Sequence, residues 1–190
     1  MKINKQTLLF ENNIIYLRPL FVSDITDEYI SGLNDPEVNK YLANVKYNVQ
    51  TRESVETFIL SNMKSKSDIL FGIFIKDDPR PFAGTLRVSG IDSFHYTASI
   101  GICLFAKRAW KKGYAVQAVQ MVKDYLFEVL GLHYIEAGVY GKNTNSINLF
   151  SSAGFREWYR VKDKYRNSDS FEKIIYFAAI NPLFDMSLLK

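Results

Sequence analysis

Cysteine is almost absent from this sequence, since Cys103 is the only one among 190 residues. A single cysteine excludes an internal disulfide framework, so we expect a reducing, cytoplasmic location. Histidine is nearly as scarce, with two residues. One cysteine and two histidines are too few ligands for a zinc-type centre, so no metal site is predicted.

Long apolar runs are missing as well. No stretch approaches the ~20 consecutive apolar residues that a membrane-spanning helix requires, and the opening MKINKQ lacks the apolar core of a secretory signal. We therefore expect no membrane partner. The length of 190 residues and the composition, 47% hydrophobic and 23% charged, are typical of a soluble globular protein. We predict one domain spanning residues 1–190.

The charge balance is mildly basic, with 24 Lys and Arg against 20 Asp and Glu and a net charge of +4. The basic residues are spread along the chain, and no helix-turn-helix, zinc or RNA-binding signature accompanies them, so nucleic acid is only a minor alternative. The one dense cluster surrounds a glycine that opens a predicted helix; it consists of Lys107, Arg108, Lys111 and Lys112. This cluster indicates a local anion rather than a polymer.

Hydrophobic periodicity predicts the order of strands and helices. Strands are predicted at 14–20, 69–76, 82–90, 96–105, 133–140, 155–161 and 171–180. Helices are predicted from a cap at Ser23 or Asp24, from Asp35, from a cap at Thr51, over 115–130 with Gly131 as its end, and over 145–153.

The lengths of the connections predict how these strands pair. Short connections between 69 and 105 favour an antiparallel meander, and Pro19 favours an edge position for the first strand. The strand at 133–140 follows a helix and should lie parallel to the strand at 96–105 through a right-handed crossover. We therefore predict an α/β (α+β) domain with a mixed, mostly antiparallel sheet flanked by helices.

Gly113 and Ala115 open the helix predicted over 115–130. The first-turn N–H groups of a helix have no intrahelical partner and lie at the positive end of its dipole. Because Gly and Ala carry little side-chain bulk, an anion can approach these groups closely. We interpret the loop as a pyrophosphate cradle, although the loop alone would also fit a plain strand–helix connection with solvated lysines.

Two motifs together extend this interpretation. The window Trp110-Lys-Lys-Gly113-Tyr114-Ala115 and the later Asn143, Ser146, Gly154 and Phe155 resemble the GNAT N-acetyltransferase superfamily, most closely its branch of ribosomal-protein N-terminal acetyltransferases. The segments 16–20 and 34–36 also look like this branch. The resemblance covers roughly residues 14 to 178, and it implies the acyl-CoA N-acyltransferase (GNAT) fold.

The resemblance also implies acetyl-CoA as a co-substrate. It places the pantetheine arm and thioester against backbone groups at the end of the 96–105 strand, and the pyrophosphate against the amides of 111–115. The implied cofactor-binding residues are Cys103, Leu104, Phe105, Arg108, Lys111, Lys112, Gly113, Tyr114, Ala115, Asn143 and Ser146. Asn and Ser equally cap helices, which is the alternative for the last two.

The sequence departs from the family pattern at several positions. Phe150 stands where the family frequently has a Tyr that protonates the leaving thiolate, Ser99 where this branch often carries Glu, and Lys111 where many relatives have Gly. Substitute proton carriers near the expected cleft are Glu136, Tyr140, Asp92 and His95, of which Glu136 and Tyr140 are our catalytic candidates. For each, a strand-edge or surface role is the alternative. Nothing in the sequence supplies an activating partner for Cys103 as a nucleophile.

By resemblance, the chain is an N-acetyltransferase that moves an acetyl group to a primary amine by direct attack in a ternary complex. The acceptor candidates are an amino-sugar nucleotide, a protein N-terminus or another small amine. The segment 34–51, with Tyr41, Lys46 and Tyr47, is expected to line the acceptor side. A homodimer is compatible with the sequence. A non-catalytic acyl-CoA-binding module is the alternative, motivated by Phe150 and Ser99.

Overall fold

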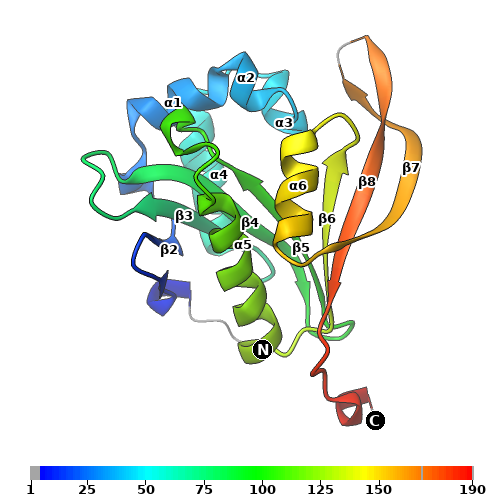
Figure 1. The fold of residues 1–190 in the computed structure, drawn as a ribbon. Helices are drawn as coiled ribbons and strands as arrows, with labels where there is room; N and C mark the ends of the chain where they lie inside the picture. The colour runs from blue at the N-terminus through cyan, green and yellow to red at the C-terminus, as the bar shows by residue number, and fades with distance from the viewer. Residues whose placement is uncertain (1–4, 168, 190) are drawn as a thin grey trace.

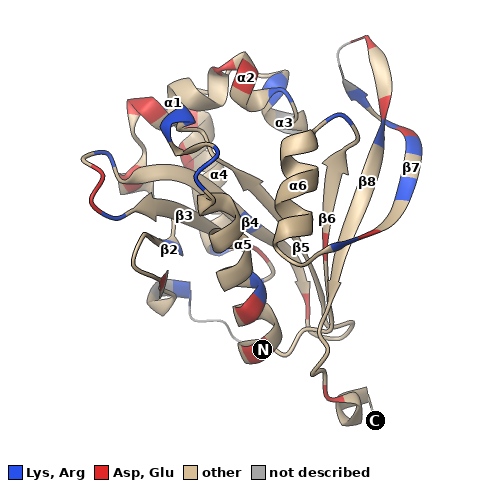
Figure 2. Cartoon of the chain, viewed as in Figure 1, with Lys and Arg blue, Asp and Glu red and all other residues tan. Residues whose placement is uncertain are grey.

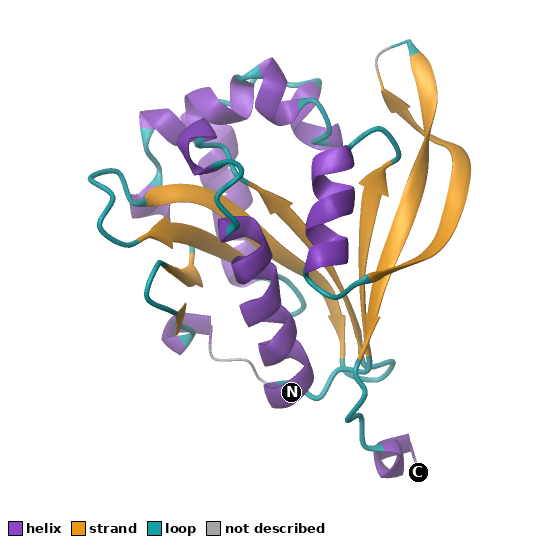
Figure 3. Cartoon of the chain, viewed as in Figure 1, coloured by secondary structure: helices purple, strands orange, loops and turns teal. Residues whose placement is uncertain are grey.

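A mixed eight-stranded sheet runs through the computed structural model, which describes residues 5–167 and 169–189. The strand order is β1-β2-β3-β4-β5-β6-β8-β7. Figures 1 and 3 show α5 and α6 packed on one face of this sheet. β3 (Ile69–Ile75) is buried along its whole length, because helices cover both faces of the sheet there.

The predicted elements occur in the predicted order, and the structure adds a short strand over 10–11 and a short helix over 43–46. The remaining strands are β1 (Phe10–Glu11), β2 (Ile15–Pro19), β4 (Phe82–Asp92), β5 (Thr97–Cys103), β6 (Tyr134–Tyr140), β7 (Arg156–Asn167) and β8 (Ser170–Ile180). The α-helices are α1 (Asp27–Asn34), α2 (Pro36–Asn39), α3 (Ala43–Lys46), α4 (Arg52–Lys64), α5 (Tyr114–Asp124) and α6 (Thr144–Ser152). Short 3₁₀ turns lie at Lys5–Thr7, Val22–Asp24, Lys107–Ala109 and Met186–Leu189, and a π-helical turn, Tyr125–Val129, continues α5.

The pairing of β5 and β6 positions the site. The predicted antiparallel meander of β3, β4 and β5 is confirmed, as is the parallel pairing of β5 with β6. That parallel pairing covers only 97–99 of β5, opposite 134–136 of β6. Beyond this point β5 continues beside β4 and β6 beside β8, so the two central strands part.

Two local predictions at the N-terminal end are wrong. β2 is not an edge strand, because β1 pairs outside it, with Phe10 opposite Leu17. The first α-helix is capped by Thr26, whose hydroxyl accepts from the Tyr29 N–H, rather than by Ser23 or Asp24. Asp24 is unavailable as a cap because its carboxylate accepts hydrogen bonds from the Arg18 guanidinium.

Other local signals are confirmed. The Asp35 carboxylate accepts from the Glu37 N–H at the start of α2, and the Thr51 hydroxyl accepts from the Ser54 N–H at the start of α4. Gly131 follows the last turn after α5 with a φ of +63°, in the left-handed region that glycine adopts most readily. Within the described part of the chain, no helix is long and apolar enough to cross a membrane.

The β7–β8 hairpin is longer than predicted. β7 continues through the polar residues 162–167 to its turn, where the sequence shows no run of apolar residues. Figure 1 shows the hairpin rising beside α3. The Tyr47 hydroxyl donates to the Arg166 carbonyl at 3.3 Å, so the hairpin contacts the segment just after α3.

The two faces of β6 and β8 carry different clusters. Val139, Ile175 and Phe177 belong to the main hydrophobic core beneath the helices. Tyr140 and Ile174, which are neighbours of these residues in sequence, form a second cluster with Tyr176, Tyr41 and Val161. Since adjacent strand residues point to opposite faces, this tyrosine-rich cluster lies on the face away from α6.

Candidate active site

A cleft of about 850 Å³ opens where β5 and β6 part. One wall is formed by 100–104 from β5 and its continuation, and another by 138–140 from β6. The starts of α5 and α6 and the residues around α2 complete the lining. The cleft therefore lies beyond the last paired residues of two parallel strands, where open α/β sheets commonly bind ligands.

The start of α5 faces this cleft. Gly113 caps the helix with a φ of +78°, and a Cβ at this position would meet only the Gln117 side-chain amide nitrogen, at 3.9 Å. The Gln117 N–H is the first to bond inside the helix, to the Gly113 carbonyl at 3.2 Å. The amides of 114–116 therefore precede the intrahelical ladder, and these residues line the cleft. The open space beside unpaired helix N–H groups fits a pyrophosphate.

The structure divides the basic cluster that the sequence places around Gly113. Lys107 forms ion pairs with Asp35 at 2.7 Å and Glu37 at 2.6 Å. The hydrogen bond from Lys107 is the main cause that lowers the pKa of the Asp35 carboxyl. Lys111 lines the cleft and has a φ of +60°, which explains why glycine suits this position. Lys112 is exposed and does not line the cleft.

Arg108 is turned away from the cleft. Its guanidinium pairs with Glu28 of α1 and with Asp78 of the β3–β4 turn, the latter at 3.2 Å, and it donates to the Phe82 carbonyl. These contacts tie the loop before α5 to α1 and to the β3–β4 turn. They leave Arg108 out of the proposed binding set.

The end of β5 is also divided between cleft and core. Cys103 and Leu104 line the cleft, and the Leu104 carbonyl accepts a hydrogen bond from the Trp110 indole at 2.8 Å. Phe105 is 2% exposed and lies in the core, with its ring centroid 4.8 Å from those of both Tyr29 and Phe82. The Phe105 side chain therefore packs α1 onto the sheet and does not reach the cleft.

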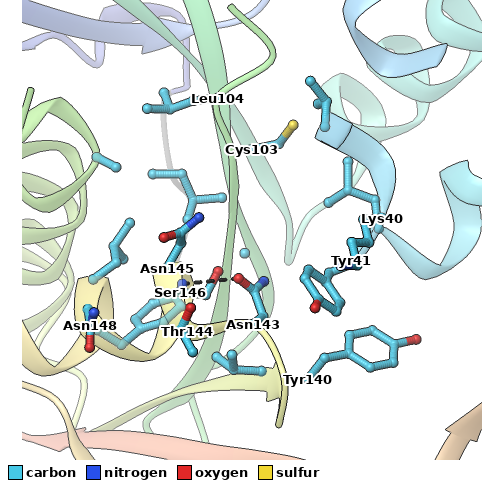
Figure 4. A pocket seen from close by; sticks show the side chains of 18 of the residues that line it. Lys40, Tyr41, Cys103, Leu104, Tyr140, Asn143, Thr144, Asn145, Ser146 and Asn148 are labelled. Atoms are coloured by element: carbon cyan, nitrogen blue, oxygen red, sulfur yellow. Dashed lines mark hydrogen bonds between the residues drawn. The ribbon is translucent and has the colours of Figure 1, made fainter. Parts of the chain in front are cut away.

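Asn143 and Ser146 stand together at the start of α6. The Asn143 side-chain oxygen accepts a hydrogen bond from the Ser146 N–H at 3.2 Å, the dashed line in Figure 4. The capping alternative is thus confirmed for Asn143. Both residues also line the cleft, where the Asn143 NH₂ group has no hydrogen-bond partner among the described residues.

Asn143→Ala separates the two roles of this residue. Loss of the cap should lower the free energy of unfolding by about 1 kcal/mol, and loss of the NH₂ donor should weaken acetyl-CoA binding several-fold. Denaturant unfolding and calorimetry measure the two effects. Thr51→Ala is the matched control, because it removes a cap that lies outside the cleft lining. Equal acetyl-CoA affinity in both variants would leave Asn143 as a cap alone.

Of the two catalytic candidates, only Tyr140 lines the cleft. Burial raises the pKa of its hydroxyl, and nearby Tyr47 and Glu172 raise it further, so Tyr140 keeps its proton at neutral pH. In Figure 4 its ring points away from Asn143 and Ser146. Tyr140 can therefore donate a proton but cannot act as a base.

Glu136 lies outside the cleft lining. It is the last residue of β6 that pairs with β5, opposite Ser99. Four strand residues, roughly 13 Å, separate it from Tyr140. The other two substitute proton carriers, Asp92 and His95, also lie outside the cleft lining. They belong to the β4–β5 turn, where the Asp92 carboxylate accepts from the N–H groups of Phe94 and His95.

The cleft also includes residues outside the predicted binding and catalytic sets. Phe150 lines the cleft and packs between Phe155 and Phe177. Lys40, just after α2, and Tyr165, in β7, also line the cleft. No sequence signal marked Tyr165, because it lies in the polar hairpin. Among residues 5–167 and 169–189, no three or more His, Cys, Asp or Glu side chains gather as metal ligands.

A mixed sheet whose central strands part over the start of a helix defines the acyl-CoA N-acyltransferase class of folds. The model of the acetyltransferase (GNAT) domain family matches residues 15–156. The uncharacterized N-acetyltransferase p20 of Bacillus licheniformis is 31% identical over 160 residues, which cover 83% of this chain and 86% of that protein. The chain therefore belongs to the GNAT acetyltransferase family, and it is an N-acetyltransferase.

Solved structures show the same fold at lower identity. Spermidine N-acetyltransferase from Vibrio cholerae, in complex with CoA and spermine, superposes with a TM-score of 0.80 at 18% identity, covering 91% of this chain and 99% of that one. Ribosomal-protein-S5-alanine acetyltransferase from Vibrio fischeri gives a TM-score of 0.78 at 21% identity, covering 94% and 99%. The predicted GNAT fold is confirmed.

Proposed function

We propose that this chain moves the acetyl group of acetyl-CoA to a primary amine, by direct attack in a ternary complex. The amine belongs to an amino-sugar nucleotide, a protein N-terminus or another small acceptor. The observation that carries this proposal is the cleft between the parted strands β5 and β6. It connects the open amides of α5 with the space beside α2, so one cavity can hold both substrates.

Acetyl-CoA supplies the acetyl group as an activated thioester. In this proposal the amides of 114–116, together with Lys111, bind its pyrophosphate. Backbone groups of 101–104 on the β6 side of β5 hold the pantetheine arm. An N–H in this stretch polarises the thioester carbonyl, because a donor aimed at developing negative charge stabilises the transition state.

The proposal includes a side-chain proton donor for the leaving thiolate but no side-chain base for the amine. Tyr140 holds its proton at neutral pH, which suits donation to the leaving thiolate. Phe150 has no hydroxyl for that task, and Glu136 is too far along β6 to serve as a base. The amine loses its proton to water before or during attack, so the proposal requires no side-chain base.

Two measurements on the wild-type protein test this function. Calorimetry with acetyl-CoA should show binding, and a thiol-release assay across amino sugars, peptides and polyamines should show turnover with at least one amine. Tight binding without turnover on any amine would favour the non-catalytic module instead. Salt-sensitive binding of oligonucleotides that excess CoA does not displace would favour the nucleic-acid alternative.

Cys103→Ala tests direct attack against an acetyl-cysteine route. Burial raises the pKa of the Cys103 thiol to about 12, so the group is protonated at neutral pH and is a poor nucleophile. We expect kcat to stay within about twofold of wild type, since a small volume change near a cleft costs little. Steady-state kinetics should show the intersecting lines of a ternary complex. Loss of turnover in both Cys103→Ala and Cys103→Ser, with an acetylated Cys103 in the wild-type intact mass, would contradict direct attack.

A further inference from the structure

Tyrosine and lysine side chains line the end of the cleft farthest from α5. This acceptor end consists of Lys40, Tyr41, Tyr140, Lys142 and Tyr165. The Tyr140 ring centroid lies 5.7 Å from that of Tyr41 and 6.1 Å from that of Tyr165. The three residues come from the α2–α3 segment, from β6 and from β7, and they offer ring faces to a ligand.

Lysines accompany these rings. The Lys40 ammonium lies 5.2 Å from the Tyr41 ring centroid, and the Lys164 ammonium 5.3 Å from that of Tyr165. The Lys142 side chain is 72% exposed in the loop after β6. Figure 2 shows basic residues around α2 and α3, in this loop and along β7.

Acidic groups balance only part of this charge. Among the described residues that line the cleft, Glu37 is the only acid, and it is paired with Lys107 at 2.6 Å. Lys142 forms an ion pair with Glu172 at 3.7 Å, but the Lys142 side chain is 72% exposed while Glu172 is 7% exposed, so the ammonium remains open to a ligand. Lys40 forms no ion pair with any described residue, and its ammonium lies over the Tyr41 ring. The acceptor end therefore carries net positive charge.

We infer that the acceptor is a small amine that also carries a phosphate, which the ammonium groups of Lys40 and Lys142 hold at the mouth of the cleft. The rings of Tyr41 and Tyr140 cover the sugar or other uncharged part of the same molecule. This inference rests on the proposed function and narrows its acceptor class. A polyamine fits poorly, because its extra ammonium groups would meet lysines of the same sign.

A pair of matched acceptors tests the inference. Glucosamine and glucosamine 6-phosphate differ only in the phosphate, and kcat/KM for acetylation of the phosphorylated amine should be at least about tenfold higher, as one charge-assisted contact provides. The preference should fall as salt rises, because the lysines are near solvent. Equal values for the two amines, or a preference for spermidine or for an acidic peptide N-terminus, would overturn the inference.

Charge-reversal variants identify the lysines that cause the preference for the phosphorylated amine. Lys40→Glu and Lys142→Glu should each remove most of the preference for glucosamine 6-phosphate while leaving the affinity for acetyl-CoA unchanged. Lys66→Glu is the control, since it makes the same charge change at an exposed residue outside the cleft lining. A preference that survives both reversals, or one that Lys66→Glu removes equally, would overturn the assignment.

A binding measurement that needs no turnover distinguishes this inference from the proposed function. Calorimetry of glucosamine 6-phosphate alone should show binding that Lys40→Glu weakens, whether or not any amine is acetylated. A wild-type protein that binds glucosamine 6-phosphate but releases no thiol on any amine would contradict the proposed function alone. A wild-type protein that acetylates amines without binding the phosphorylated one would contradict the inference alone.

Discussion

Gly113→Asp is expected to lower the affinity for acetyl-CoA at least about a hundredfold, since charge-assisted contacts to a phosphate contribute about 1.5–3 kcal/mol each. Gly113 has a φ of +78° and leaves open space in front of the first amides of α5. An aspartate places a negative charge where the pyrophosphate is proposed to bind. Its carboxylate can also accept from the same N–H groups, as Asp does at helix caps, and so compete with the ligand for its donors.

Two control variants separate charge from backbone strain. Gly113→Asn has nearly the same shape without the charge, and Asn tolerates the left-handed region, so it should retain much more affinity than Gly113→Asp. Gly131→Asp introduces the same residue at a φ of +63°, with nothing within 4 Å of its Cβ and outside the cleft lining. Calorimetry on the folded variants is the measurement. Wild-type affinity in a folded Gly113→Asp protein would remove the cradle from the proposed site.

The features that could be predicted from the sequence are those with short-range causes. Asp35, Thr51 and Gly131 mark helix ends because a cap depends on a few neighbouring backbone groups. Apolar runs separated by short turns predict the meander for a similar reason, because a short connection leaves antiparallel pairing as the only choice. Gly113 belongs to this class, because a small residue at a helix start is a local signal. Asn143 was selected as a cofactor residue through the family resemblance, and its local signal is that of a helix cap.

The basic cluster before α5 shows where such reasoning stops. Lys107 and Arg108 are adjacent to the cradle in sequence, but their partners Asp35, Glu37, Glu28 and Asp78 are 30 or more residues away. Nothing local distinguishes these two residues from Lys111, which does line the cleft. Ion pairing is decided by the tertiary fold, so charge near a binding loop in sequence is weak evidence for charge at the ligand.

The acceptor end of the cleft could not be assembled from the sequence for the same reason. Tyr41, Tyr140 and Tyr165 meet from three separate segments, and the last lies in a hairpin whose polar strand has no apolar periodicity. The position of Glu136 relative to the cleft could not be predicted for a related reason. Strand order places it near the cleft, but only the register with Ser99 reveals that it lies before the point where the strands part.

Phe105→Ala is expected to lower the free energy of unfolding by about 3–5 kcal/mol, the usual cost of truncating a buried phenylalanine. Its ring is 2% exposed and packs against Tyr29 and Phe82. α1 lies directly on it, since a Cβ on Gly32 would come within 2.9 Å of the Phe105 Cβ. The cavity would therefore loosen the attachment of α1 to the sheet. That cost is a large share of the roughly 5–15 kcal/mol that stabilises a typical domain.

This expectation concerns the Phe105 side chain alone, because the cofactor contact expected at the end of this strand is made by backbone groups. Phe105→Leu refills much of the volume, so it should cost less stability than Phe105→Ala and leave acetyl-CoA affinity unchanged, because only the side chain differs and it does not reach the cleft. Phe94→Ala, at a ring that is 82% exposed, should change the unfolding free energy by less than about 0.5 kcal/mol. Denaturant unfolding with calorimetry on each variant decides the matter. A Phe105→Leu protein of wild-type stability that has lost acetyl-CoA binding would show that the Phe105 side chain contacts the cofactor. That result would contradict the packing of this ring against Tyr29 and Phe82.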